Sequence, residues 1–371
     1  MRIAIACHPT QGGSGIVATE LAIALAAKGH DMHMVSCNRP YRLTERHAIS
    51  FHQVYVPEYP LFKYPPHDLS VVNKLVQVSL EHDIDIIHAH YAVPHAICAI
   101  LAQHVAKPKN VKVVATMHGT DITLVGSHPE FADICRYTMQ HADALTVVSE
   151  WGKQRTRDSF KLKRDPVVIH NFVDTSKFTP KGRIGYPGKG ESFVLVHASN
   201  FRPVKRVADI IRVFFEVQKE LPARLKLVGK GPELGIAREL CAELGICDKV
   251  EFCGSVFDIA RVFRNSHLFL LLSDYESFGL SALEAMACGA PAAASRAGGL
   301  PEVIQDNGSG LLNPVGANYE AAQRIIRLLR QPDKWRAMSQ QAAQAARERF
   351  SIAQVIPRYE RLYHQVLEEN R

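Results

Sequence analysis

The sequence predicts an α/β protein made of two doubly wound domains, each built around a parallel sheet. Its 371 residues exceed the length at which one core usually keeps growing, so two domains are the default expectation. Short apolar runs alternate with helical patterns, and this alternation breaks once, in a stretch rich in Gly, Pro and Lys at 171–192. Hydrophobic residues make up 47% and charged residues 22%, which is ordinary globular usage and argues against a disordered chain.

The apolar runs of the first half lack strict alternation. Such runs indicate strands buried on both faces, which is typical of a parallel sheet with helical crossovers. The predicted strands are 2–7, 31–36, 51–56, 84–90, 111–117, 144–149 and 167–171, and the predicted helices include 15–29, 68–82, 95–106 and 130–141.

The same pattern restarts after the break at 171–192, which we interpret as the interdomain linker. We expect a Rossmann-like N-terminal domain over 1–170 and a Rossmann-like C-terminal domain over 171–351, with ligands at the carboxyl ends of the strands. The predicted strands of the second half are 193–199, 224–229, 249–254, 267–273, 291–295 and 310–314, and helices are predicted at about 204–220, 232–244 and 279–288, with three more helical patterns after them.

Charge, apolar runs and cysteine spacing limit the classes of function that the chain can have. The formal net charge of +7 is a mild excess that suits an anionic small molecule and equally suits a solvated surface. No basic block with interleaved aromatics predicts nucleic-acid binding. The first apolar run is too short for a signal peptide and no run reaches the length of a membrane span, so we expect a cytoplasmic protein. The eight cysteines show no CxxC or paired zinc spacing, which favours buried reduced thiols.

The first turn, CHPTQGGSG, leads from a strand into a helix that opens near Ser14. Gly12, Gly13 and Gly15 permit close backbone approach, and the helix end offers free N–H groups, so an anion should bind there. The turn is not GxGxxG and no acid ends the second strand, so a dinucleotide site is poorly supported. A tight turn alone stays open as a reading of this motif.

A stronger signal is SDYESFGLSALEAMACG, in which Glu276 and Glu284 stand eight residues apart. Phe278 and Gly279 lead into a helix whose first turn can donate N–H groups to a diphosphate. Two glutamates at this spacing usually mark a solvated helix face. Here Glu284 is embedded in apolar sequence, where an unpaired carboxylate is costly, and this setting favours a functional role.

Two further loops follow predicted strands. Arg202, Lys205 and Arg206 come after strand 193–199 and suit a diphosphate, although three cations alone more often form a surface patch. In the first domain His118 follows strand 111–117. The hydroxyls of Thr116 and Thr120 flank it, and Tyr91 ends the preceding strand, which predicts a polar pocket facing the glycine turn.

Together these residues resemble the retaining glycosyltransferases of the GT-B fold. The motif Glu276–Glu284 with SFGL between its glutamates carries the resemblance, and NFVDTSKF, VGKGPE and AGGLPEVI also match. The resemblance covers nearly the whole chain. It implies two Rossmann-like domains facing across a cleft, with the C-terminal helix 352–371 packing back on the first domain.

A narrower resemblance concerns the acceptor. Stretches such as HAHYAVPHA, TMHGTDIT and HASNFRPVKR look like the branch of the family that acts first in bacillithiol biosynthesis. This resemblance implies transfer of N-acetylglucosamine from UDP-N-acetylglucosamine to L-malate with retention, without a cofactor or a membrane partner. A related transferase acting on inositol phosphate or another sugar stays open, as do a UDP-sugar epimerase and a homodimeric assembly.

With this resemblance we hypothesise roles for individual residues. Fixed cations and helix-end dipoles can stabilise a leaving phosphate in place of a metal, and no Asp-x-Asp pair is suited to chelating one. We favour same-face attack, with Asp121 open as a nucleophile. The family's usual arginine is Asn200 here, so either Arg202 or Arg206 supplies that charge. The expected catalytic residues are His118, Glu276, Lys205 and Arg202; the donor-binding residues are Glu284, Ser277, Phe278, Gly279, Leu280, Gly13, Asn200 and Arg206; and the acceptor-binding residues are Ser14, Tyr91, Thr116 and Thr120.

Overall fold

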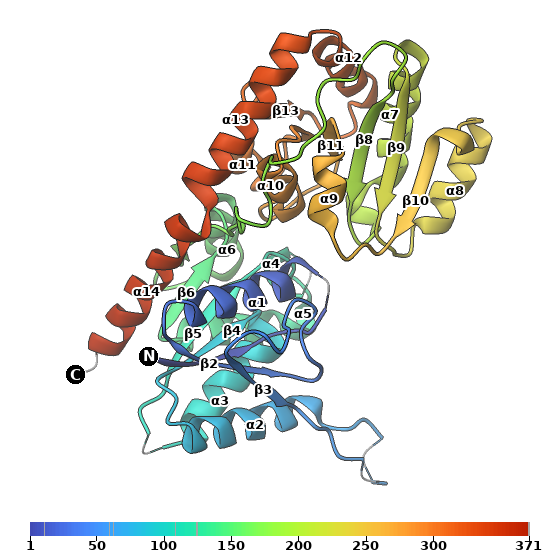
Figure 1. Cartoon of the computed structure of the whole chain (residues 1–371). Helices are drawn as coiled ribbons and strands as arrows, with labels where there is room; N and C mark the ends of the chain where they lie inside the picture. Colours follow the sequence, from blue (N-terminus) through green and yellow to red (C-terminus); the bar gives the residue numbers. More distant parts are fainter. Residues whose placement is uncertain (11, 59, 62, 108, 124, 370–371) are drawn as a thin grey trace. The chain divides into compact units, whose positions relative to one another are not determined.

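The computed structural model forms two compact units, which are described separately below (Figure 1). Unit 1 comprises Met1–Asn171 together with Val355–Arg371, and unit 2 comprises Phe172–Gln354. The structure describes residues 1–10, 12–58, 60–61, 63–107, 109–123 and 125–369.

Unit 1 is built on a seven-stranded sheet in the order β3-β2-β1-β4-β5-β6-β7, in which all pairings are parallel. Strands β1 and β4 are neighbours, and their register pairs Ile3 with Ile86. Strands β2 and β3 continue the sheet beyond β1, and β5, β6 and β7 continue it beyond β4. This confirms the doubly wound parallel sheet predicted from the apolar runs. The strands are β1 (Arg2–Ala6), β2 (Asp31–Ser36), β3 (Ile49–Gln53), β4 (Ile86–His90), β5 (Lys112–Met117), β6 (Ala144–Val147) and β7 (Val167–Val168).

Helices cover both faces of this sheet, with α1 on one side and α2 and α3 on the other (Figure 1). One of the helices, α6, was not predicted because it is mostly polar and buries only Gly152, Thr156 and Phe160. Its beginning is nevertheless capped, since Ser149 Oγ accepts a hydrogen bond from the Gly152 N–H at 3.0 Å. The helices are α1 (Gly13–Ala26), α2 (His67–Glu81), the π-helical turn η1 (Ala92–Ala96), α3 (Ile97–Val105), α4 (Thr120–Thr123), α5 (Pro129–His141) and α6 (Glu150–Phe160).

The last helix, α14 (Ile352–Glu368), belongs to unit 1 from Val355 onward. Its buried stripe includes Tyr359 and Tyr363, and the Tyr363 hydroxyl lies 2.7 Å from His88 Nδ1 beneath the sheet. On its outer side Glu360 forms an ion pair with Lys28. The C-terminal helix is therefore part of the unit 1 core.

Unit 2 holds a six-stranded parallel sheet in the order β10-β9-β8-β11-β12-β13. Helix α7 packs with α8 and α12, whereas α10 packs with α9 and α13. The second doubly wound domain is thereby confirmed. Its elements are β8 (Phe193–Ala198), the 3-10 turn η2 (Pro203–Lys205), α7 (Val207–Glu220), β9 (Ala223–Val228), α8 (Leu234–Glu243), η3 (Cys247–Lys249), β10 (Val250–Gly254), α9 (Ile259–Arg264), β11 (Leu268–Leu271), α10 (Leu280–Ala287), β12 (Ala292–Ser295), α11 (Leu300–Val303), β13 (Gly310–Asn313), α12 (Asn318–Leu329) and α13 (Pro332–Phe350).

The segment 172–192 contains no helix or named strand, as its Gly-rich and Pro-rich sequence suggests. Phe172, Val173 and Phe178 are nevertheless buried, so the first part of this segment is not an exposed loop. Across the described ranges, no helix combines the length and the apolar character that a membrane crossing requires.

Candidate active site

Apart from Gly13, which begins α1 in unit 1, and Leu280 and Glu284, which lie in α10, the predicted donor residues lie in loops that follow β8 and β11. These two strands are neighbours in the unit 2 sheet. Strand β12 lies on the other side of β11. Since the strands are parallel, the loops after all of them meet at one edge of the sheet, where doubly wound domains bind ligands.

An ion pair joins two of these loops. Lys205 Nζ donates to Glu276 Oε1 at 2.6 Å, and Ser273 Oγ donates to the same carboxylate oxygen at 2.8 Å. The side chains of Lys205 and Glu276 are 20% and 13% exposed, so the pair is largely shielded yet reachable from solvent. Sequence analysis had singled out Lys205 and Glu276 but not Ser273, whose role depends on how the loop folds back.

The loop after β12 contacts the backbone of Glu276. The Gly299 N–H donates to the Glu276 carbonyl at 2.8 Å. Gly298 has φ +60°, and a Cβ at that position would lie 1.9 Å from the same carbonyl oxygen. Only glycine fits at position 298, and this is a steric reason for the second glycine of AGGLPEVI.

The structure separates the two arginines that sequence analysis left as alternatives. Arg206 is held by two carboxylates, Asp209 at 2.5 Å and Asp274 at 2.9 Å. Within the described ranges, no salt bridge or side-chain hydrogen bond engages Arg202. Arg202 therefore carries the uncompensated positive charge of this loop.

The N-terminus of α10 lies beside the ion pair in the chain. Gly279 precedes the helix with φ +94°, and a Cβ there would lie 2.5 Å from Leu300 Cδ2. Phe278 is buried, with its ring edge-on to Phe350 at 5.5 Å. The first N–H groups of α10, starting at Leu280, have no hydrogen-bond acceptor within the helix, so they can donate to a ligand.

The remaining donor residues of unit 2 differ in exposure. Glu284 is 6% exposed within α10, Ser277 is partly exposed, and Asn200 is exposed. The Asn200 carbonyl lies so close to Gly231 that a Cβ on that glycine would be 1.9 Å away. The VGKGPE turn thus packs directly under the loop that follows β8.

In unit 1 the predicted residues follow β1, β4 and β5, except Thr116, which lies within β5. The three strands are neighbours in the sheet. His118 Nε2 lies 2.8 Å from His90 Nδ1, and the two rings are stacked. Tyr91 has φ +83° and its ring lies 5.4 Å from that of His118 and 5.5 Å from that of His8. His8 in turn meets His95 edge-on at 4.4 Å.

These imidazoles are neutral at physiological pH. Burial lowers the pKa of His118 and of His95 to about 3, and burial lowers the pKa of His90 well below its ordinary value. Neutral rings donate through one nitrogen and accept through the other, so the cluster can bind hydroxyl and carbonyl groups. Sequence analysis named His118 and Tyr91 but gave no role to His8 and His95; their position after β1 and β4 was the available signal.

Asp121 does not present a free nucleophile. Its carboxylate is fully buried and accepts hydrogen bonds from the N–H groups of Gly119 at 2.7 Å and His118 at 3.0 Å. Burial raises the pKa of Asp121 to about 6. The carboxylate fixes the turn that carries His118, and the nucleophile role left open for it loses support.

Thr116, which was expected to bind the acceptor, lies within β5. Thr116 is fully buried, and its hydroxyl lies 2.7 Å from His88 Nε2 and 2.5 Å from Thr146 Oγ1. These partners lie among the strands of the sheet, so the hydroxyl has no open direction toward a ligand. Thr120, at the start of α4, is partly exposed.

The glycine turn of unit 1 forms the beginning of α1. Gly13 is exposed and Ser14 is partly exposed at this helix end. A Cβ on Gly15 would lie 2.6 Å from the carbonyl oxygens of both His8 and Thr10, so the close turn depends on that glycine. The N–H groups of this helix end add an anion-binding element to the histidine cluster.

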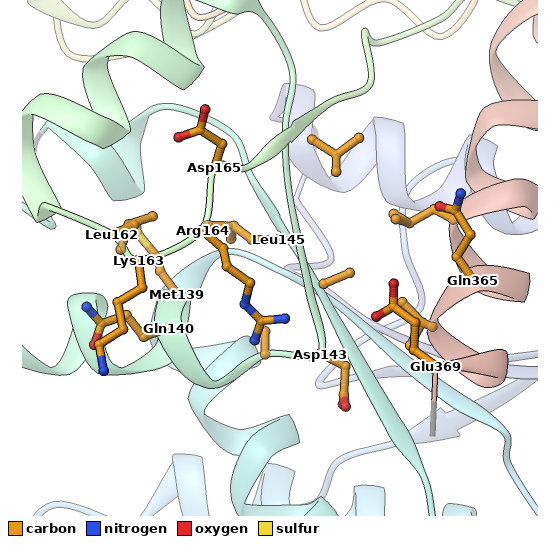
Figure 2. A pocket seen from close by; sticks show the side chains of 15 residues that line it. Met139, Gln140, Asp143, Leu145, Leu162, Lys163, Arg164, Asp165, Gln365 and Glu369 are labelled. Carbon is orange, nitrogen blue, oxygen red and sulfur yellow. The ribbon is translucent and has the colours of Figure 1, made fainter. Parts of the chain in front are cut away.

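The opposite edge of the unit 1 sheet holds a pocket without these features (Figure 2). Asp143 and Ala144 line it where β6 begins, and Val167 lines it where β7 begins. In Figure 2 the side chain of Arg164 extends toward Asp143. The pocket lies at the amino ends of the strands, whereas His118 follows a carboxyl end, so it is separate from the candidate site.

Comparison with known proteins gives a family for both units. A family model described as Glycosyltransferase Family 4 matches residues 11–177, and one described as Glycosyl transferases group 1 matches residues 183–347. A glycosyltransferase from Rickettsia africae superimposes with a TM-score of 0.82 at 19% identity, over 99% of this chain and 98% of that protein. HepE from Anabaena, solved in complex with UDP and glucose, gives a TM-score of 0.81 at 20% identity, over 98% of this chain and 99% of that one.

These structural likenesses confirm the GT-B fold that the sequence resemblance implied. At the level of sequence, N-acetyl-alpha-D-glucosaminyl L-malate synthase from Bacillus anthracis is 39% identical over 100% of this chain and 98% of its own length. The chain therefore belongs to the GT-B glycosyltransferase family that includes this synthase.

Proposed function

We propose that this enzyme transfers N-acetylglucosamine from UDP-N-acetylglucosamine to the hydroxyl of L-malate, with retention at the anomeric carbon. The relative from Bacillus anthracis, 39% identical over the whole chain, bears a name that describes this product. The observation that carries the proposal is the Lys205–Glu276 ion pair after β8 and β11, next to a helix N-terminus in the chain. A cation, a sugar-binding carboxylate and free N–H groups are what a sugar diphosphate requires.

In this proposal the donor occupies the carboxyl edge of the unit 2 sheet. Arg202 and Lys205 hold the diphosphate together with the N–H groups at Gly279 and Leu280. Glu276 accepts hydrogen bonds from sugar hydroxyls, with Ser277 and Phe278 fixing the loop. Glu284 accepts the ribose hydroxyls.

The acceptor occupies the carboxyl edge of the unit 1 sheet. The N–H group at Ser14 favours a carboxylate of malate because it lies at the positive end of α1. Neutral His118, with Nε2 engaged by His90, uses its other ring nitrogen toward a sugar hydroxyl. Tyr91 and Thr120 offer hydroxyl groups beside it.

The chemistry follows from where charge develops. The malate hydroxyl oxygen bonds to the anomeric carbon while the bond from that carbon to the β-phosphate oxygen breaks, and the hydroxyl proton passes to that departing oxygen. Negative charge grows on the phosphate, where Arg202, Lys205 and the α10 N-terminus stabilise it. Attack on the face that the phosphate leaves gives retention without a carboxylate nucleophile, in keeping with the buried and hydrogen-bonded Asp121.

The test is UDP release from UDP-N-acetylglucosamine with a panel of acceptors. We expect release that depends on L-malate and that D-malate, inositol phosphate and glucose fail to support at equal concentration. Release with inositol phosphate in place of malate would reject the acceptor. Formation of a different UDP-sugar without any acceptor would instead identify an epimerase.

A further inference from the structure

Three histidines outside the candidate active site converge at the edge of the unit 1 sheet. His33 lies on β2, His52 lies on the edge strand β3, and His82 directly follows the last residue of α2. The register pairs His52 with Val35, so His52 and His33 project from the same face of the sheet. No sequence motif predicts this cluster, because 19 residues separate the first two histidines and the third follows the end of a helix.

The three side chains are close enough to share one ion. One ring nitrogen from each lies within 4.8 Å of the other two. His33 Nδ1 is 2.9 Å from His52 Nε2, and the His82 ring centroid is 4.5 Å from that of His33 and 5.0 Å from that of His52. Nitrogens bound to one tetrahedral zinc ion at about 2.0 Å are separated by roughly 3.3 Å, so modest side-chain rotations suffice.

A second, independent observation points to a ligand here. His33 is only 2% exposed, and its Nε2 has no hydrogen-bond partner with acceptable geometry among the described residues. Asp31 Oδ1 lies 3.3 Å from that nitrogen, on the side of the ring away from Nδ1, which faces His52. A carboxylate beside the outer nitrogen is the usual surrounding of a metal-ligating imidazole.

We propose that His33, His52 and His82 bind a divalent transition-metal ion of the zinc type, with water as the fourth ligand. Imidazole nitrogens suit zinc in tetrahedral geometry. Metal ligation requires neutral imidazole, and burial lowers the pKa of His33 and, to about 4, the pKa of His52.

The surrounding charge is mixed and compatible with a cation. Lys74 on α2 acts on His52 and opposes a cation. Asp31, which begins β2, and the carboxyl end of α2 at His82 both favour one. The ion would join an edge strand, its neighbour and a helix end, while the candidate active site follows the carboxyl ends of β1, β4 and β5. The geometry therefore assigns the ion a structural role.

The experiment uses the full chain without an affinity tag, stripped with a chelator and dialysed. Zn²⁺ and Co²⁺ are titrated into the wild type and into the double variant His52→Gln/His82→Gln, with His141→Gln as control. His141 is an exposed histidine of the same unit, stacked on Tyr137 outside the cluster. We expect one ion per wild-type chain, the visible absorption of tetrahedral Co²⁺, a rise in Tm with Zn²⁺, and none of these in the double variant.

The control variant should behave as the wild type, and all three proteins should transfer sugar at similar rates. Equal metal binding by the double variant and the wild type, or no binding by the wild type, would overturn the proposal. X-ray absorption spectroscopy on zinc-loaded wild type decides the matter without substitutions, since it should count three imidazole ligands. Fewer than two would mean an adventitious ion.

Discussion

Lys205 Nζ lies 2.6 Å from Glu276 Oε1 and so connects the loop after β8 to the loop after β11. In the proposed function this pair holds the carboxylate that binds the sugar in place before the donor arrives. Ser273 Oγ donates to the same carboxylate oxygen at 2.8 Å. A preorganised pair of this kind stabilises charge that develops during the reaction without reorganising at that moment.

Replacement of either member of this pair should reduce turnover severely. We expect Lys205→Ala and Glu276→Ala each to lower kcat by about 100- to 1000-fold. Because the two side chains act as one unit, the double variant should lose less than the product of the single losses. Steady-state kinetics checks this, with Lys219→Ala as control because Lys219 pairs with Glu216 on exposed α7 surface. Strictly multiplicative losses would show that the residues act separately.

The two arginines of the same loop should behave differently. Arg202→Ala should lower kcat/KM for UDP-N-acetylglucosamine by about tenfold or more, because a charge-assisted hydrogen bond is worth about 1.5–3 kcal/mol. Arg206→Ala should mainly lower Tm, since Asp209 is buried and loses one of its two arginine partners. Donor affinity by calorimetry and Tm by scanning calorimetry separate the two effects. A larger loss of donor affinity in the Arg206 variant would reverse our assignment.

The glycine behind Glu276 provides a steric test. Gly298→Ala places a Cβ where the Glu276 carbonyl lies 1.9 Å away, and φ +60° adds backbone strain. The loop must shift, so we expect at least a tenfold fall in kcat/KM. Gly235→Ala on α8 is the matched control, because a Cβ there meets nothing within 4 Å. Unchanged activity in the Gly298 variant would mean that the exact position of Glu276 is unimportant.

Stability should fall in mild acid. The pKa values of His88, His95 and His118 are each lowered to about 3, so the folded state stays unprotonated where the unfolded chain, with pKa about 6.5, binds protons. Their contribution to the free energy of unfolding is complete above pH 6.5 and is lost as the pH falls toward 3. Asp121, with its pKa raised to about 6, opposes this between pH 6 and 4 because its folded form takes up the proton.

Three histidines outweigh one carboxyl here, so the free energy of unfolding should fall as the pH drops from 6 to 4. Chemical denaturation at several pH values measures the slope. A free energy of unfolding that stays flat over this range would show that these imidazoles are hydrated in the folded protein.

Much of the fold was predictable because strands buried on both faces leave continuous apolar runs such as those of β1 and β11. Helix α9 was missed because its six residues are too few to show a period. The predicted helix at 204–220 begins later, at Val207, because Pro203–Lys205 form a 3-10 turn and Arg206 adopts φ +49°.

Residues of the candidate site were predictable where they lie in a short continuous motif directly after a predicted strand. Lys205 and Glu276 both follow strands that read clearly from the sequence. The contacts of Ser273 and Gly298 with Glu276 depend on three loops meeting, which no single stretch encodes. The surroundings of Thr116 were not predictable, because a strand's last residues alternate between its two faces, and only the partners His88 and Thr146 show that its hydroxyl lies within the sheet.

The most direct test of the proposed reaction is the structure of its product. The wild-type protein, UDP-N-acetylglucosamine and L-malate are incubated together, and the product is analysed by mass spectrometry and proton NMR. We predict one N-acetylglucosamine joined to one malate, an α-anomeric proton signal, and one UDP released per product. A β-anomer, or free N-acetylglucosamine with unmodified malate, would contradict the account.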